Sequence, residues 1–421
     1  MRSRNLTFGS INLYDFHPVL RTIEFTNMKG ISNFFYLLSI SLLFISNTAC
    51  NKTETITEDY TAIKAQFANK IDPTNLANYA NQGKPAYINK DNTGNNIITD
   101  AKATLGRVLF YDKQLSINNT TSCGSCHVQK FAFGDTALSS LGVQNGRTGR
   151  HSMRLINSRF SNERRFFWDE RAATLEEQTT QPIKDHAEMG FSGQDGRPAF
   201  ATLLPKLQAI GYYQELFRFV YGDENVNEQR LQECLSQFVR SIQSFDSKYD
   251  QGRAVAPDNQ QFPNFTQQEN VGKTLFQAAP QFSADGVRIA GGLGCAGCHA
   301  APEFSIDPNS GNNGIIGVLN GTGIDINNTR APSLRDLLGV NGTLNGPMMH
   351  TGGITSLNTL IGHYGRINLA PGNTRLDPRL RPNGVGQQLN LNANEVDAVV
   401  AFLKTLTGTA VYTDARWSDP F

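Results

Sequence analysis

The 421-residue sequence has little charge and almost no net charge. Lys, Arg, Asp and Glu make up 18% of the residues, and the formal net charge is +1. Overall charge therefore gives no attraction to nucleic acid or to an acidic membrane surface. Only six cysteines occur in a chain longer than one typical core supports. This excludes a small disulfide-stapled module and predicts two domains with additional segments.

A hydrophobic run long enough to cross a membrane is also lacking near the N-terminus. The apolar run at residues 34–46 has about a dozen residues, which is too short to span a bilayer and is typical of a signal-peptide core. Met28 precedes it as the expected true start, so residues 1–49 are a predicted leader. Cys50 stands where a bacterial lipoprotein carries its lipid, with plain secretion as the alternative. We expect an exported, periplasmic lipoprotein anchored to a membrane, with a polar tether over residues 50–95.

The rest of the composition is that of a globular protein. Hydrophobic residues make up 39%, and 26 phenylalanines provide enough apolar material for sizeable cores. Gly (38) and Pro (17) are plentiful. This balance predicts short helices joined by long loops around a bound group.

One five-residue pattern, CxxCH, occurs twice. In this pattern two thiols attach a c-type haem and the following imidazole ligates its iron. The copies are Cys123, Cys126 and His127, and Cys295, Cys298 and His299.

Two other readings of these motifs use the same thiols. The two pairs could share one zinc ion, or each could be a redox dithiol. Zinc does not require a histidine directly after both pairs, and a thioredoxin-like site needs a strand-helix context that is missing here. The motifs therefore predict two covalently bound haem c groups, which agrees with export because this haem is attached after export.

The surroundings of the two motifs repeat, which indicates a duplication. A GxxLF segment beginning at Gly106 precedes the first motif, and another beginning at Gly272 precedes the second. Each is expected to open the first helix of its half. Further on, Trp168 aligns with His350. We predict a mainly α protein with two tandem cytochrome c-like domains joined by helices and long loops, at residues 96–262 and 263–421.

Two other helices are visible in the hydrophobic pattern. Apolar residues recur at helical spacing between residues 231 and 245, and Cys234 lies on that stripe, where a buried core thiol is expected. A last helix is opened by Asn392 with Glu395 three residues later, a variant of the capping box, and Gly408 ends it.

At this point the chain resembles the bacterial di-haem cytochrome c peroxidases and their MauG-like relatives. The resemblance covers roughly residues 100–410 and rests on the segments LGRVLFYDKQLSINNTTSCGSCH, FFWDERAATLEEQTTQPIKDHAEMG, RAPSLRD and PMMHTGGITSL. It implies that His127 ligates a peroxidatic haem and His299 an electron-transfer haem. It further implies that Trp168 lies between the haems, that Gln178 is the distal glutamine and that Glu188 is the distal acid.

The chemistry of peroxide reduction needs these residue types. One carboxyl, here Glu188, can take a proton from the near oxygen of a peroxide and deliver it to the departing oxygen. Gln178 is a neutral dipole that could orient the peroxide, and Trp168 offers an aromatic stepping stone between two cofactors. From residue type alone, Trp168 would be a core residue and Glu188 a solvated one.

The sequence departs from the family in several places. Many members have a histidine that blocks the peroxidatic iron, and residues 141–146 contain none. His151 stands where relatives use Asn to help bind calcium, so calcium is in doubt. His151 and His186 could reach the iron, or could be ordinary core or surface histidines.

The sixth ligand of the second haem is expected to be a methionine thioether, which raises a haem's potential. Relatives supply Met or Tyr from the segment that reads PMMHTGG here, and this segment has no Tyr. Met348 is the first choice, with Met349 as the alternative.

Two functions follow from the resemblance. The first is an enzyme that reduces hydrogen peroxide to water with electrons from a small exported cytochrome or similar donor, entering at the C-terminal haem. The alternative is a MauG-like oxidase acting on a protein or a small organic substrate. A weaker third reading is an electron carrier. The partners expected are peroxide and the donor, with a homodimer as a further option and no nucleic acid.

Overall fold

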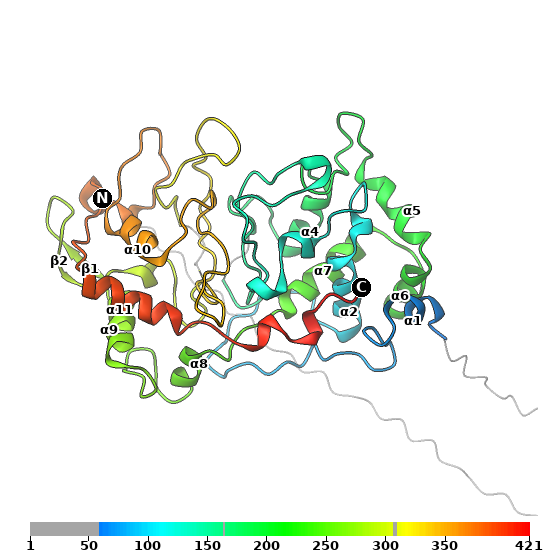
Figure 1. Ribbon diagram of the computed structural model, residues 1–421, viewed down its shortest axis with the longest axis horizontal. Coiled ribbons are helices and arrows are strands. Elements are labelled where there is room, and N and C mark those ends of the chain that lie inside the picture. Colours follow the sequence, from blue (N-terminus) through cyan, green and yellow to red (C-terminus); the bar gives the residue numbers. More distant parts are fainter. Residues whose placement is uncertain (1–58, 163–164, 306–309) are drawn as a thin grey trace, which may run out of the picture. The chain divides into compact units, whose positions relative to one another are not determined.

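The computed structural model describes residues 59–162, 165–305 and 310–421, and this part of the chain is mainly helical, as predicted (Figure 1). The leader, Met28 and the predicted lipidation site Cys50 lie outside the described residues. No helix within those ranges is long and apolar enough to cross a membrane.

The α-helices are joined by long loops and short 3₁₀ turns. They are α1 (Thr61–Phe67), α2 (Asp100–Tyr111), α3 (Cys123–Cys126), α4 (Leu175–Lys184), α5 (Leu203–Gln208), α6 (Gly211–Tyr221), α7 (Glu228–Ser241), α8 (Lys248–Arg253), α9 (Gln267–Gln277), α10 (Leu357–Gly365) and α11 (Ala393–Lys404). Strands β1 (Pro280–Phe282) and β2 (Arg288–Gly291) pair antiparallel after α9.

The buried apolar residues form two clusters. The first draws on residues 63–242 and on Val411 and Trp417 near the C-terminus. The second lies between Tyr249 and Leu406. The chain therefore buries two hydrophobic cores, and its last residues return to pack on the first one.

One helix pair at the centre of each core is built in the same way (Figure 1). In the first pair, α2 packs on α7, and the rings of Phe110 and Phe238 lie 5.1 Å apart at 56°. In the second pair, α9 packs on α11, and the rings of Phe276 and Phe402 lie 5.2 Å apart at 57°. Two ring pairs with nearly equal geometry agree with the duplication predicted from the GxxLF repeat.

The glycines of the repeat explain how closely these helices approach. A Cβ atom on Gly106 would lie 2.0 Å from the carbonyl oxygen of Cys234, and one on Gly272 would lie 1.9 Å from that of Ala398. Both glycines lie in the middle of their helices, so the prediction that GxxLF opens each helix was wrong. Thr99 and Thr266 cap the helices further upstream.

The predicted tether is also corrected over the residues that the structure describes. Residues 59–95 fold onto the first core, and the side chains of Ile63, Phe67 and Tyr79 are fully or almost fully buried there. The tyrosine hydroxyl of Tyr79 donates to the carbonyl oxygen of Arg416 at 2.7 Å. Burial of such apolar side chains outweighs the polar composition of the stretch around them.

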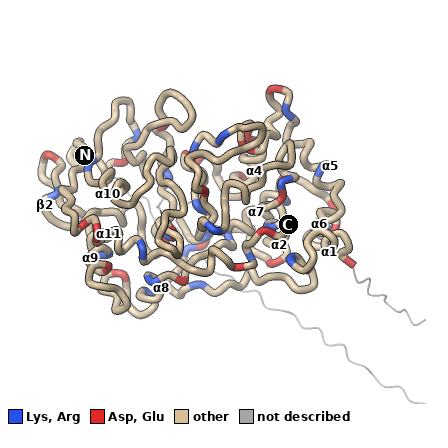
Figure 2. The backbone as a smooth tube through the Cα atoms, in the orientation of Figure 1, with Lys and Arg blue, Asp and Glu red and all other residues tan. Residues whose placement is uncertain are grey.

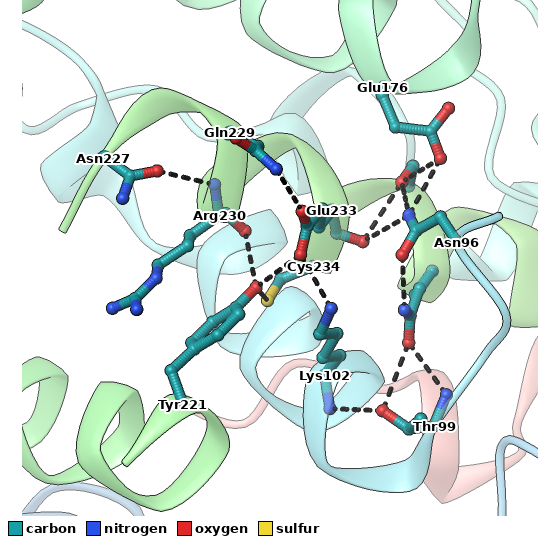
Figure 3. A network of polar contacts seen from close by, with 12 residues as sticks. Asn96, Thr99, Lys102, Glu176, Tyr221, Asn227, Gln229, Arg230, Glu233 and Cys234 are labelled. Atoms are coloured by element: carbon teal, nitrogen blue, oxygen red, sulfur yellow. Dashed lines mark hydrogen bonds and ion pairs between the residues drawn. The ribbon is translucent and has the colours of Figure 1, made fainter. Parts of the chain in front are cut away.

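The two predicted helices are present as α7 and α11, but both are shorter at their C-terminal ends than predicted: α7 ends at Ser241 rather than near residue 245, and α11 ends at Lys404 rather than at Gly408. In α11, Asn392 and Glu395 form the expected capping box. Cys234 of α7 is fully buried, as predicted, and accepts or donates a hydrogen bond with the Tyr221 hydroxyl at 3.3 Å (Figure 3). Burial raises the pKa of its thiol to about 12, so Cys234 is a neutral core residue.

Charged residues are scattered over the described chain. Figure 2 shows short stretches of Lys and Arg interspersed with stretches of Asp and Glu. This distribution agrees with the low net charge of the sequence.

Candidate functional site

Two large cavities contain the two CxxCH motifs. One, of about 590 Å³, is lined by Cys123, Cys126 and His127. The other, of about 630 Å³, is lined by Cys295, Cys298 and His299. Both volumes lie in the range of cofactor sites. Below they are called the first and the second cavity.

The two histidines have the protonation state that an iron ligand needs. Burial lowers the pKa of His127 and lowers that of His299 to about 4, so both rings are neutral. Nδ1 of His127 lies 3.1 Å from the carbonyl oxygen of Phe133. With Nδ1–H donating to this oxygen, Nε2 keeps its lone pair for a metal.

A buried cation in the cavity wall also fits haem. Arg154 lines both cavities, and its Nε is buried without a hydrogen-bond partner within the described residues. Its Nη2 donates to the carbonyl oxygen of Ser333 at 2.9 Å. Burial lowers the pKa of Arg154. An anionic group such as a haem propionate would compensate this charge.

The three predicted catalytic residues all line the first cavity. Gln178 lies on α4, which Thr174 begins by accepting a hydrogen bond from the Glu177 backbone N–H. Glu188 follows the end of α4, and Trp168 lies in the loop before it. The fold thus brings side chains from a helix and from both of its flanking loops to one cavity with His127.

Glu188 has the properties of a group that can exchange protons near neutral pH. Burial raises its pKa to about 7, the neighbouring carboxylate of Asp185 adds to this effect, and Arg171 opposes it. Because an acid-base catalyst works best with a pKa near the working pH, this environment suits the role expected from the resemblance.

Trp168 belongs to the wall between the cavities and lines both of them. Its indole N–H donates to the carbonyl oxygen of His151 at 2.7 Å. Its own carbonyl oxygen accepts hydrogen bonds from the backbone N–H groups of Thr329 (2.9 Å) and Arg330 (3.1 Å). Trp168 is therefore fixed to segments from both halves of the sequence.

Met348 and Met349 both line the second cavity and are both buried. The amide nitrogen of Asn313 lies 3.1 Å from the Met349 sulfur, so this sulfur already has a protein partner. Met349 also has a positive φ of 70°. Among the described residues no hydrogen bond to the Met348 sulfur is present, and Met348 has no positive φ. The backbone N–H of Met348 donates to the carbonyl oxygen of Ile354 at 2.7 Å.

The two other histidines considered for the iron each form a hydrogen bond to the protein through Nδ1, as His127 does. His151 is buried and lines both cavities, with its Nδ1 3.0 Å from the carbonyl oxygen of Ala137. His186 is partly buried, with its Nδ1 3.0 Å from the Ser192 hydroxyl.

Sequence reasoning missed a cation at the junction of the two halves. Arg150 forms ion pairs of 2.7 Å with both Asp169 and Asp325. The only sequence signal for Arg150 was that Arg150 and Arg330 occur at corresponding places after the two motifs.

Residues 59–162, 165–305 and 310–421 contain no group of three or more His, Cys, Asp or Glu side chains that could hold a metal ion.

Comparisons with known proteins agree with this site. Residues 100–256 match the model of the family described as di-haem cytochrome c peroxidase. The chain is 28% identical to the methylamine utilization protein MauG of Methylophilus methylotrophus, over 76% of this chain and 86% of that protein. It is also 28% identical to the cytochrome c551 peroxidase of Nitrosomonas europaea, over 73% of this chain and 80% of that protein.

Solved structures show a similar fold. A MauG-like protein associated with microbial copper homeostasis is 27% identical, with a TM-score of 0.60 over 81% of this chain and 99% of that one. The diheme peroxidase BthA from Burkholderia thailandensis, at 20% identity, has a TM-score of 0.53 over 83% of this chain and 92% of that one.

The cavities and the comparisons together indicate a di-haem oxidoreductase. The chain is similar to the bacterial di-haem cytochrome c peroxidases and MauG proteins, as the sequence motifs predicted. The family implies haem c as the cofactor.

Proposed function

We propose that this protein reduces hydrogen peroxide to water in the first cavity, with electrons that enter at the second cavity from a small exported cytochrome or a similar donor. One observation carries the proposal. Each CxxCH motif lines its own cavity, the two cavities share Trp168, and Gln178 and Glu188 line only the first. The cavities thus differ in the polar groups that peroxide chemistry requires.

The proposal includes two tandem cytochrome c-like domains, at residues 96–262 and 263–421. Two buried clusters and two matching helix pairs support it. Each domain would hold one haem c through its two cysteines, with His127 or His299 as the axial ligand. Met348 would be the sixth ligand in the second domain.

Two electrons and two protons convert one hydrogen peroxide into two waters. Haem, when bound, would supply the redox chemistry: the two electrons from the donor, with two protons from solvent, reduce the remaining oxygen to the second water. Glu188 would accept the proton of the near oxygen and give it to the departing oxygen, which becomes water. Gln178 would orient the peroxide through its amide without adding charge. Trp168, fixed in the common wall, would carry electrons between the two cavities.

A MauG-like oxidase is the second candidate. The observation in its favour is the similarity to MauG of Methylophilus methylotrophus over 86% of that protein's length. The same residues would then serve the oxidation of a protein or small organic substrate. A methionine at the second haem favours the peroxidase.

We further infer that the protein is exported to the periplasm. The apolar run at residues 34–46 supports export, and the position of Cys50 supports a lipid anchor. A calcium ion between the haems and a homodimer remain predictions of the resemblance.

A peroxide-consumption assay on the purified full-length holoprotein tests the proposal. Mass spectrometry should first show two haem additions. Reduced cytochrome c should then be oxidised in a ratio of two per peroxide consumed. One haem addition, or zinc in its place, would overturn the cofactor assignment. Two haems without peroxide turnover, but with oxidation of an organic substrate, would favour the MauG-like alternative.

A further inference from the structure

The backbone of Glu188 is held from two sides. Its N–H donates to Oδ1 of Asp185 at 3.0 Å, and the N–H of Ala187 donates to the same oxygen at 2.8 Å. On the other side, its carbonyl oxygen accepts a hydrogen bond of 2.9 Å from the N–H of Val143. The end of α4 and the loop at residues 141–146 therefore fix the position of Glu188 together.

The loop at residues 141–146 reaches this backbone because it has glycines at the contact. A Cβ atom on Gly142 would lie 1.9 Å from the carbonyl oxygen of Ala187, and one on Gly146 would lie 2.5 Å from it. Arg197 links the two segments by donating to Oε1 of Gln144 at 2.9 Å and to the carbonyl oxygen of His186. The loop is a support for the segment at residues 185–188.

Asp185 acts on Glu188 through its charge as well as through hydrogen bonds, whereas the loop at residues 141–146 acts through backbone contacts. Asp185 is exposed and lines the same cavity as Glu188. Burial is the largest cause of the raised pKa of Glu188, and the Asp185 carboxylate is the second largest. Arg171 acts in the opposite direction and lowers this pKa. The other charged residues in the wall of this cavity are Arg150, Arg154, Asp325 and Arg330. Its other titratable groups are Cys123, Cys126, His127 and His151, and the thiols of Cys123 and Cys126 are close enough for the charge of Glu188 to raise their pKa.

We propose that Asp185 is a positioning residue that holds the Glu188 backbone through Oδ1 and places a fixed negative charge beside the Glu188 carboxyl, and so sets the pH range in which Glu188 exchanges protons. The inference rests on the proposed role of Glu188 as the acid-base group. Since a negative neighbour disfavours a second negative charge, removing the Asp185 charge favours the ionised form of Glu188. The carboxylate that accepts the peroxide proton then forms at lower pH.

Asp185→Asn separates the charge from the hydrogen bonds, because its amide oxygen can still accept from both N–H groups. We expect a neighbouring like charge to account for a shift of about one pH unit. The rising limb of the peroxide rate against pH, with a midpoint near the Glu188 pKa of about 7, should move down by that amount. At pH 6 the variant should then react about fivefold faster than the wild type, because the ionised fraction rises from about one in eleven to one half.

A second measurement reads the same group without turnover. Infrared difference spectra of the oxidised holoprotein at stepped pH show the carbonyl stretch of protonated carboxyls. The band missing in Glu188→Gln belongs to Glu188, and its midpoint should move down in Asp185→Asn. Asp185→Ser, a second neutral variant, should move it in the same direction.

Two further variants complete the test. Asp185→Ala removes charge and acceptor together, so it should also lower the maximal rate by displacing Glu188. Asp72→Asn is the matched control, because Asp72 is an exposed aspartate whose Oδ1 accepts the Thr74 N–H at 2.9 Å away from the cavity. It should change neither midpoint nor rate.

The outcomes distinguish a failure of the Asp185 inference from a failure of the catalytic role of Glu188. An unchanged Glu188 band midpoint in both Asp185→Asn and Asp185→Ser overturns the inference, even if Glu188→Gln is inactive. Full turnover in Glu188→Gln overturns the catalytic role of Glu188, and the infrared midpoints still decide whether Asp185 controls its ionisation.

Discussion

The rings of Trp168 and His350 meet edge to face, with centroids 6.3 Å apart and an interplanar angle of 65°. These are the two positions that align in the internal repeat, so the duplicated halves contact each other through corresponding residues. Burial lowers the pKa of His350, and its Nε2 lies 2.8 Å from the carbonyl oxygen of Gly317. Trp168 therefore borders a neutral, fixed ring rather than a cation.

Replacing this tryptophan tests its role between the cavities. Trp168→Phe keeps an aromatic ring but loses the N–H that donates to His151 and the more easily oxidised indole. We expect both haems to be retained and electron transfer between them to slow, as measured by stopped-flow absorption after rapid reduction of the second haem. An unchanged rate would make Trp168 a packing residue only. Trp417→Phe, in the first core, is the control.

The proposed acid-base role of Glu188 gives a prediction about turnover. Glu188→Gln keeps the size of the side chain but cannot accept and return a proton, so the peroxide rate should fall about a hundredfold or more while both haems remain bound. Glu224→Gln, which affects a partly exposed ion pair with Arg218, should leave the rate unchanged. Normal steady-state kinetics in Glu188→Gln would exclude it as the distal catalyst.

The two neighbouring methionines should behave differently. Met348→Leu should change the spectrum of the C-terminal haem and lower its potential, because a thioether ligand raises the potential. Met349→Leu should leave both properties in place, since the Met349 sulfur already contacts Asn313 at 3.1 Å. Potentiometric titration followed by absorption separates the two haems. The reverse result would assign Met349 as the sixth ligand of the second haem.

The helix-pairing glycines give a prediction about stability. Alanine normally stabilises a helix interior by up to about 1 kcal/mol relative to glycine. At Gly272 the added Cβ would lie 1.9 Å from a carbonyl oxygen, so Gly272→Ala should destabilise the protein by about 1–3 kcal/mol instead. Apart from its chain neighbours and the backbone of its own helix, Gly362 of α10 has no atom within 4 Å of its would-be Cβ. Gly362→Ala should be neutral or stabilising in thermal unfolding, and equal effects would contradict the packing argument.

The haem attachment residues could be predicted from the sequence because a CxxCH motif has few other uses. Gln178, Glu188 and Trp168 were assigned through the family resemblance, and they come from one stretch in which α4 and its flanking loops face one cavity. The amphipathic spacing of α7 likewise placed Cys234 in the core.

Features that depend on contacts between distant segments could not be predicted. Ile63, Phe67 and Tyr79 are buried, but they lie in a polar stretch without a regular period. The hydrogen bond from Val143 to Glu188 joins segments 45 positions apart through backbone atoms, which leave no trace in residue type. The ion pairs of Arg150 could not be predicted from its place in the repeat, because its two aspartates come from different halves.

The last prediction concerns access to the peroxidatic iron. Residues 141–146 contain no histidine, and the loop is tied to Glu188 through Val143 and to Arg197 through Gln144. His151 and His186 each form a hydrogen bond through Nδ1, as His127 does, and this contact does not occupy Nε2. From the loop at residues 141–146 alone, we expect the iron to be five-coordinate or water-bound when both haems are oxidised.

Such a site should react with peroxide without being half-reduced first. Electron paramagnetic resonance of the fully oxidised protein should show a high-spin signal, and mixing with peroxide should give an immediate reaction. His186→Ala and His151→Ala should leave both results unchanged. Two low-spin haems, together with a lag that pre-reduction abolishes, would mean that a residue closes the site. If replacing one of these histidines restored the high-spin signal, that histidine would be the iron ligand. A neutral imidazole needs only a movable loop to reach the iron.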